Sequence, residues 1–267
     1  MNPVAFNLGP FSIHWYSLCI LAAFLLGFLL VKKEIKRHNI DSNFLGDYFF
    51  YLVPIVILGA RIYYVVFEWY YYKDDLLEIF KVWNGGLAIH GGVIAGIIYT
   101  YLFCKKKHIN PFRFMDIAAP SLVLGQAIGR WGNFFNQEAY GPVVTLKELK
   151  NLHIPEFIID GMKIDGVYHH PTFLYESLTC LVCFIIIFSL RRFYKNLKVG
   201  TCCGIYFIIY GIERFLVESM RQDSLMLGSI KVAQLVSIIG IIIGIICIIL
   251  SLIKKVPYLE DKKEKEE

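Results

Sequence analysis

The stretch that decides the fold is VAQLVSIIGIIIGIICIILSLI, residues 232–253, near the end of the chain. It holds no charged residue, and Lys254 follows it directly. A helix of about 20 apolar residues is long enough to cross the hydrocarbon core of a bilayer. We therefore expect this stretch to be a transmembrane helix and the chain to be an all-α integral membrane protein.

Apolar runs of similar length recur upstream of this stretch, and the composition agrees with them. Of the 267 residues, 57% are hydrophobic and 18% are charged, whereas soluble domains are about 25% charged. We expect about seven helices, near residues 15–33, 47–67, 88–104, 112–130, 172–190, 201–219 and 232–253. They leave no room for a sizeable soluble domain, so residues 1–267 are predicted to form a single polytopic membrane domain.

Lysines and arginines are distributed unevenly between the two sides of the predicted helices. The loops after the first, third and fifth helices and the tail at 254–267 are rich in them, whereas the other loops carry few. Cytoplasmic loops carry the excess of basic residues in membrane proteins. This predicts an N terminus outside, a charged cytoplasmic tail at 254–267, and an extracytoplasmic cap at 131–171. The net charge of +5 thus indicates membrane topology and no nucleic-acid partner.

Several polar residues stand inside the predicted helices, where a charge costs about 2.5–3.5 kcal/mol at the bilayer centre. They gather in the outer halves or at the outer ends of these helices: Arg61, His90, Arg130, Arg214 and Glu218. One face of the sixth predicted helix carries Tyr210, Arg214, Glu218 and Arg221. Guanidinium groups bind phosphate bidentately. Several arginines with few carboxylates therefore predict an anionic ligand.

Structural interpretations of the same residues stay open. Arg214 and Glu218 have the i, i+4 spacing of an ordinary helical ion pair. His90 alone is more often a polar residue with satisfied hydrogen bonds than a base. Gly91 and Gly92 are the small residues that let two helices approach closely. The convergence of several arginines at one level is harder to explain in this way than any one of them.

The end of the fourth predicted helix carries an irregular stretch, GRWGNFFNQEAYG, residues 129–141. An arginine, two asparagines and a glutamate are spaced there by glycines and aromatic residues, with no regular amphipathic pattern. Non-helical backbone is tolerated at membrane depth only where it lines a cavity or is buried in protein. This stretch is therefore predicted to be a re-entrant or broken segment that lines a cavity.

This stretch looks like the signature of a known family. The sequence resembles the bacterial phosphatidylglycerol–prolipoprotein diacylglyceryl transferase family over almost the whole chain. The residues at matching places of the family signature are Arg130, Asn133, Asn136, Glu138 and Gly141. Other motifs follow in the family order: His14-Trp15-Tyr16, Gly59-Ala60-Arg61, Ile89-His90-Gly91-Gly92, His170-Pro171-Thr172 with Tyr175-Glu176, and Tyr210-Gly211 with Arg214, Glu218 and Arg221. Six motifs in one order are a far more specific signal than any single one.

The resemblance implies a reaction between two substrates that live in the bacterial cell membrane. The diacylglyceryl group of phosphatidylglycerol moves to the thiol of the lipobox cysteine in a prolipoprotein signal peptide. A thioether forms and glycerol phosphate leaves, which is the first step of lipoprotein maturation. The nucleophile belongs to the protein substrate, the active site faces the extracytoplasmic side, and no metal or cofactor is expected.

The same resemblance and the needs of this chemistry imply roles for individual residues. Arg130 and Arg214 are expected to contact the phosphate, with Arg214 oriented by Glu218. His90 is the expected base for the thiol, although Glu138 or Tyr16, or the arginines alone, remain alternatives. Asn133 and Asn136 either hold headgroup oxygens or fix the turn, and His170 either binds substrate or orders the cap. Further substrate contacts are expected from Arg61, Glu138, Gly141, Tyr210, Glu218 and Arg221.

Three other classes of protein compete with this hypothesis. Arginines in helices would also suit an anion transporter or channel, but we see no inverted repeat and no matched pair of broken helices. An intramembrane protease needs a Ser–His or paired-aspartate arrangement, and Asp116 has no partner aspartate at comparable depth. A non-catalytic lipoprotein-binding module would keep the groove and tolerate the loss of Arg130.

Overall fold

The computed structural model describes residues 1–9, 11–41, 43–194, 196–221, 226–228, 230–253, 256–257 and 259. Of the predicted charged tail at 254–267, all but 256, 257 and 259 lies outside the described residues. The chain is mostly helical. The predicted all-α class is therefore confirmed.

Seven long helices run through the described part of the chain, and they lie within a few residues of the predicted ones. They are α1 (Trp15–Arg37), α2 (Asn43–Phe67), α4 (Ile89–Lys106), α5 (Pro111–Asn136), α8 (Thr172–Phe193), α9 (Thr201–Met220) and α10 (Val232–Ile253). Among these, α2, α8 and α10 are long and apolar enough to cross a membrane. The length and apolar composition of these helices and the mean hydropathy of +0.55 are those of a membrane protein.

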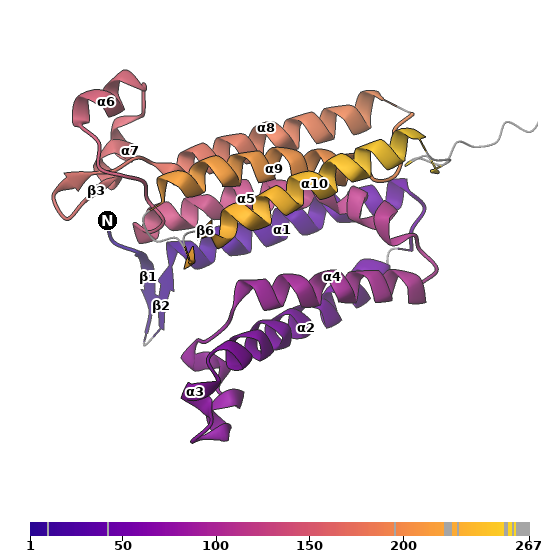
Figure 1. The fold of residues 1–267 in the computed structure, drawn as a ribbon, viewed down its shortest axis with the longest axis horizontal. Coiled ribbons are helices and arrows are strands. Elements are labelled where there is room, and N and C mark those ends of the chain that lie inside the picture. Colours follow the sequence, from indigo (N-terminus) through magenta and orange to yellow (C-terminus); the bar gives the residue numbers. More distant parts are fainter. Residues whose placement is uncertain are drawn as a thin grey trace, which may run out of the picture. The chain divides into compact units, whose positions relative to one another are not determined.

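The described chain forms two compact units, one of residues 1–34 and 115–267 and one of residues 35–114. In the first unit, α5, α8, α9 and α10 run alongside one another (Figure 1). Helices α9 and α10 pack through glycines, since an added Cβ on Gly244 would lie 2.7 Å from the carbonyl oxygen of Gly204. Short hairpins flank the bundle: β1 (Val4–Leu8) pairs with β2 (Phe11–His14), and β5 (Met226–Leu227) pairs with β6 (Ile230–Lys231).

In the second unit, α2 packs closely against α4. An added Cβ on Gly91 would lie 2.3 Å from the carbonyl oxygen of Gly59, and one on Gly59 would lie 2.3 Å from the Cβ of Ala95. The prediction that the glycines of the third helix allow a close approach is confirmed. Between these two helices the chain forms α3 (Trp69–Tyr72) and two 3₁₀ turns, η1 (Leu76–Phe80) and η2 (Val82–Asn84).

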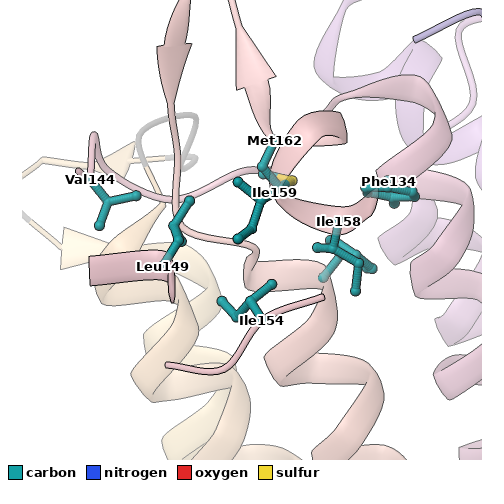
Figure 2. Close-up of a cluster of buried hydrophobic side chains, with 8 residues drawn as sticks. Phe134, Val144, Leu149, Ile154, Ile158, Ile159 and Met162 are labelled. Atoms are coloured by element: carbon teal, nitrogen blue, oxygen red, sulfur yellow. The ribbon is translucent and has the colours of Figure 1, made fainter. Parts of the chain in front are cut away.

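The predicted cap has structure of its own. It contains α6 (Leu146–Asn151), α7 (Glu156–Gly161) and the hairpin of β3 (Lys163–Ile164) and β4 (Val167–Tyr168). These elements lie at the end of the first unit where α5 ends and α8 begins (Figure 1). Figure 2 shows the apolar cluster that holds them together: Phe134, Val144, Leu149, Ile154, Ile158, Ile159 and Met162, joined by Phe173. The side chain of Leu149 is fully buried in it.

A capping box starts α6 within this cap. The Thr145 hydroxyl accepts from the Glu148 backbone N–H, and the Glu148 carboxylate accepts from the Thr145 backbone N–H. Because the Thr145 hydroxyl and backbone N–H both donate to this carboxylate, the pKa of Glu148 lies below its usual range.

The prediction of a broken segment at 129–141 is wrong for most of its length. Helix α5 continues to Asn136, so Arg130, Asn133 and Asn136 stand on regular helix. Only 137–141 is irregular, with positive φ at Gln137 (51°) and Ala139 (57°). Aromatic packing favours the helical form: Phe134 stacks on Phe173, with ring centroids 4.6 Å apart, and Phe135 stacks on Trp15 at 5.1 Å.

Candidate active site

A cluster of buried charges joins α5, α8 and α9 in the first unit. Nη2 of Arg130 lies 2.5 Å from Oε2 of Glu176, and Nη1 of Arg214 lies 3.6 Å from the same oxygen. Nη2 of Arg214 also lies 2.8 Å from Oε2 of Glu218, one helical turn along α9. The Glu176 and Glu218 side chains are only 1% and 3% exposed, while both arginine side chains are 19% exposed. We call Arg130, Glu176, Arg214 and Glu218 the ion cluster.

One arginine of the ion cluster, Arg214, has a buried N–H donor that no hydrogen bond among the described residues uses. Among the described residues, Nη1 of Arg214 has no hydrogen-bond partner, although it is buried. Oε2 of Glu176 and Oε2 of Glu218 likewise contact arginines at ion-pair distance without hydrogen-bond geometry. A buried N–H without a partner is costly. The cluster is therefore suited to accept a further hydrogen-bonding anion.

Two further residues predicted for the site belong to α9 and its C-cap, Tyr210 on the helix and Arg221 directly after it. The Tyr210 ring stacks on Tyr206 with centroids 5.6 Å apart, and the Tyr206 hydroxyl accepts a hydrogen bond of 2.9 Å from Nε2 of Gln126 on α5. Arg221 is the residue that ends α9. Nζ of Lys231 donates to the carbonyl oxygens of Glu218 (2.6 Å) and Arg221 (2.9 Å). This lysine satisfies carbonyls that the end of a helix leaves without partners.

The signature residues after Arg130 fold back on one another at the end of α5. Nδ2 of Asn133 donates to Oε1 of Glu138 at 2.8 Å, and the Glu138 N–H donates to the Asn133 carbonyl at 3.0 Å. Asn136 and Glu138 are both exposed. The asparagine–glutamate contact fixes the turn that ends the helix and leaves the second Glu138 oxygen towards solvent.

The end of the signature meets the His-Pro-Thr motif that begins α8. The Gly141 N–H donates to the His170 carbonyl at 3.0 Å, and an added Cβ on Gly141 would lie 2.8 Å from the His170 Cβ. Only glycine allows this approach. Nδ1 of His170 is 3.0 Å from the Tyr175 hydroxyl, and the Thr172 hydroxyl donates to the Ala139 carbonyl. These contacts hold in place the segment between α5 and α8, the two helices that carry Arg130 and Glu176.

Tyr16 stands at the start of α1 and packs on the signature helix. An added Cβ on Gly132 would lie 2.6 Å from Cδ2 of the Tyr16 ring, so the ring lies flat against the α5 backbone one turn before Asn136. The Tyr16 side chain is 37% exposed. Its hydroxyl is thus reachable from outside the helix bundle, beside the signature residues.

Arg61 belongs to the second unit and is 4% exposed. Its five donors all go to backbone carbonyls, and its guanidinium lies 5.0 Å from the centre of the Tyr72 ring. The acceptors are the carbonyls of Ile79 (2.8 Å), Gly85 (2.7 Å), Gly86 (2.9 Å), Glu78 (2.6 Å) and Lys81 (3.5 Å). A guanidinium has five N–H donors. Arg61 is therefore fully occupied in holding the segment between α3 and α4.

His90 also belongs to the second unit, as the second residue of α4. It is exposed, and its ring centroid lies 6.1 Å from that of Tyr63. The neighbouring Gly91 and Gly92 are buried against α2. The close packing of these glycines places the histidine at the start of the helix with its ring exposed.

The sequence model of the prolipoprotein diacylglyceryl transferase family matches residues 3–250. The chain belongs to this family. The resemblance expected from the motifs is thereby confirmed.

Relatives in this family are similar along nearly their full length. The phosphatidylglycerol–prolipoprotein diacylglyceryl transferase of Staphylococcus xylosus is 49% identical over 255 residues, which cover 95% of this chain and 91% of that protein. The protein of the same name from Streptococcus equi subsp. zooepidemicus (strain MGCS10565) is 50% identical over 248 residues, 93% of this chain and 94% of that protein. The one from Staphylococcus haemolyticus (strain JCSC1435) is 48% identical over 260 residues.

Glu176 is the member of the site that the sequence interpretation did not assign to a role. It stands in the His-Pro-Thr motif of this transferase chain, and it is the carboxylate that both arginines of the ion cluster share. Four N-terminal residues of α8 separate it from Pro171. The available signal was a carboxylate inside a predicted helix, in the same motif as His170 and Pro171.

Proposed function

We propose that this chain transfers the diacylglyceryl group of phosphatidylglycerol to the cysteine thiol of prolipoproteins. The thiol belongs to the lipobox of the signal peptide, a thioether forms, and glycerol phosphate leaves. The proposal is supported by the names of relatives about 50% identical over most of the chain. The observation that carries it is the ion cluster, in which two partly buried arginines share one buried carboxylate and Nη1 of Arg214 has no hydrogen-bond partner among the described residues.

The proposal includes a membrane topology. All seven long helices cross the bacterial cell membrane, with the N terminus outside and the C terminus in the cytoplasm. Basic residues in the last turns of α1, α4 and α8 support this orientation, because such residues mark cytoplasmic ends. The ion cluster and the cap then belong to the extracytoplasmic side, where an exported signal peptide presents its cysteine.

In the proposed mechanism, Arg130 and Arg214 bind the phosphodiester of the lipid. Attack of the thiolate forms a sulfur–carbon bond on the diacylglyceryl group, and the bond from that carbon to the phosphate oxygen breaks. The leaving glycerol phosphate gains a negative charge on that oxygen. Donors already fixed at this place stabilise the charge as it develops. Glu176 and Glu218 hold the two guanidiniums in position before the lipid arrives.

The thiol must lose its proton before it attacks, because the thiolate is the nucleophile. His90 is the proposed base, as an exposed imidazole suited to proton transfer near neutral pH. Tyr16 and Glu138 are the alternatives, and both are exposed beside the signature helix. A pH–rate profile of His90→Gln decides among them: loss of the acidic limb supports His90, and a limb unchanged from wild type contradicts it.

The remaining site residues receive supporting roles in this proposal. Asn133 and Asn136 contact headgroup oxygens, with Glu138 orienting Asn133 through their hydrogen bond. Gly141 and His170 keep the segment between α5 and α8 in place, and Tyr210 and Arg221 border the headgroup on α9. Arg61 acts as a positioning residue, because its donors are all used by backbone carbonyls.

The proposal is tested by incubating purified protein with phosphatidylglycerol and a signal-peptide substrate, followed by mass spectrometry of the peptide. Wild type should add one diacylglyceryl mass to the cysteine, and Arg130→Ala should not. Arg192→Ala is the matched control, since Arg192 lies at the other end of α8 and pairs with Glu34 at 3.5 Å. Near-normal transfer by Arg130→Ala would remove the phosphate role.

A further inference from the structure

One buried carboxyl beside the ion cluster has no assigned role. Glu213 on α9 precedes Arg214 and is 5% exposed. Neither of its carboxylate oxygens has a hydrogen-bond partner among the described residues. By contrast, Glu176 and Glu218 each have an arginine nitrogen within 2.8 Å. A buried charged group without a partner is unfavourable, so Glu213 is the member of this region whose charge is easiest to remove.

Glu213 borders a hollow between α8 and α9. The hollow has a volume of about 390 Å³ and is lined on α8 by Tyr175 and Thr179, and on α9 mainly by apolar side chains such as Ile212 and Leu216. This volume admits water molecules. None of the four ion-cluster residues lines this hollow, so it reaches Glu213 from a side that the two arginines do not occupy.

The charges around Glu213 are unbalanced. The titratable and charged groups that act electrostatically on Glu213 are Glu176 and Cys180 on α8, Arg130 on α5, and Tyr210 and Arg214 on its own helix. Tyr175 lines the same hollow, and Cys183 lines a second, smaller hollow that Glu213 also borders. Helix α10, which packs on the other side of α9, carries no acidic or basic residue. With Glu218 included, this described region holds three carboxyl groups and two guanidiniums, and the guanidiniums pair with Glu176 and Glu218.

A lipid phosphate bound to the two arginines adds another negative charge to this region. Opposite charges nearby favour a charged carboxylate, and like charges disfavour it. The phosphate competes for both arginines, on which the charged form of Glu213 depends. We infer that Glu213 takes up a proton when an anionic lipid headgroup binds to Arg130 and Arg214, and that it thereby sets the pH dependence of lipid binding. This inference rests on the proposed function.

The proton is taken up from the solvent when the lipid binds and is released after glycerol phosphate leaves. Glu213 contacts neither the lipid nor the thiol in this account, so it is a positioning residue that acts through the charge on the arginines. Linkage fixes the sign of the effect. Because the lipid-bound state holds one more proton, binding weakens as the pH rises, by up to about tenfold per pH unit.

The test is the KM for phosphatidylglycerol as a function of pH, measured on the full chain in micelles at a fixed signal-peptide concentration. Between about pH 5 and pH 9, where buried carboxyl groups titrate, the KM of wild type should rise with pH. The KM of Glu213→Gln should stay flat, near the wild-type value at low pH. Glu156→Gln, on the exposed surface of α7, should follow wild type. A flat wild-type profile, or a Glu213→Gln profile that rises like wild type, overturns the inference.

A second measurement covers the case in which Glu213→Gln does not fold. Phosphatidylglycerol is added to wild type without peptide in weakly buffered solution, and a pH-sensitive dye reports the protons bound. Uptake of up to one proton per bound lipid supports the inference, and no uptake overturns it. Diacylglycerol, which lacks the phosphate, should cause none. Arg130→Ala separates the two claims: an unchanged KM for the lipid in that variant would instead contradict the proposed function.

Discussion

Two arginines that look alike in the sequence have different surroundings in the folded chain. Arg61 in the second unit donates all five of its N–H groups to backbone carbonyls of residues 78–86. Arg214 in the first unit forms ion pairs with the carboxylates of Glu176 and Glu218, and its Nη1 has no hydrogen-bond partner among the described residues. A fully occupied guanidinium stabilises a loop, whereas a partly occupied one can still bind an anion. The substitutions below test this difference.

The largest effect on activity is expected from Arg214→Lys. Lysine keeps the positive charge beside Glu176 and Glu218 but loses the planar fork that binds phosphate through two bonds. Transfer should fall about 100- to 1000-fold, as for other losses of one preorganised donor, while the melting temperature changes little. Single-turnover rates and thermal melts on the same sample measure both. A rate within a few-fold of wild type would mean that the fork geometry is not used.

The opposite pattern is expected from Arg61→Met. Five carbonyls lose a charged donor, so the free energy of unfolding should fall by about 3 kcal/mol or more. The folded fraction should retain transfer within about tenfold of wild type, since Arg61 is proposed to act only through the segment that it holds. Denaturant melts and activity per folded molecule give the two numbers. A stable but inactive Arg61→Met would contradict the positioning role.

A smaller loss of stability is expected from Gly91→Ala in the second unit. The new methyl would lie 2.3 Å from both the Gly59 carbonyl oxygen and the Tyr63 Cβ, so α2 and α4 must move apart. This should lower the free energy of unfolding by about 1–3 kcal/mol. Gly46→Ala on α2 is the matched control, because nothing lies within 4 Å of its added Cβ. Thermal melts should separate the two variants, and equal melting temperatures would argue against the close helix contact.

The smallest effect is expected from Thr145→Val in the cap. The capping box is lost, which should lower the free energy of unfolding by about 1 kcal/mol for the N-cap residue of α6 alone. Diacylglyceryl transfer should be unaffected. Because the pKa of Glu148 is lowered by Thr145, the box stabilises the cap above the usual carboxyl range and is lost as the pH falls through the lowered pKa. Hydrogen exchange of the α6 amides should show faster opening in the variant near neutral pH and a smaller difference in acid. No difference at neutral pH would contradict this.

The positions of the helices follow from hydropathy, because a bilayer requires apolar runs of a fixed length. The Arg214–Glu218 contact follows from the i, i+4 spacing, and the close α2–α4 packing follows from Gly59, Gly91 and Gly92. These features depend on residues near one another in the sequence or on a periodic pattern. For that reason they could be predicted without coordinates.

The partners of Arg130 and Arg61 could not be predicted in the same way. Glu176 meets Arg130 only because α5 and α8 pack side by side, 46 positions apart in the sequence. The carbonyls that bind Arg61 belong to backbone, which leaves no signal in the side chains. The continuous α5 was missed because Gly129 and Gly132 suggest a break, whereas stacking of Phe134 and Phe135 on distant aromatic residues favours helix.

The most direct measurement is the affinity of purified protein for phosphatidylglycerol, compared between Arg130→Lys and Arg61→Lys by native mass spectrometry without peptide substrate. If the ion cluster is the phosphate site, the affinity of Arg130→Lys for the lipid should fall at least about tenfold. Folded Arg61→Lys should then bind the lipid like wild type. Wild-type affinity in Arg130→Lys, or the same loss in both variants, would contradict the account.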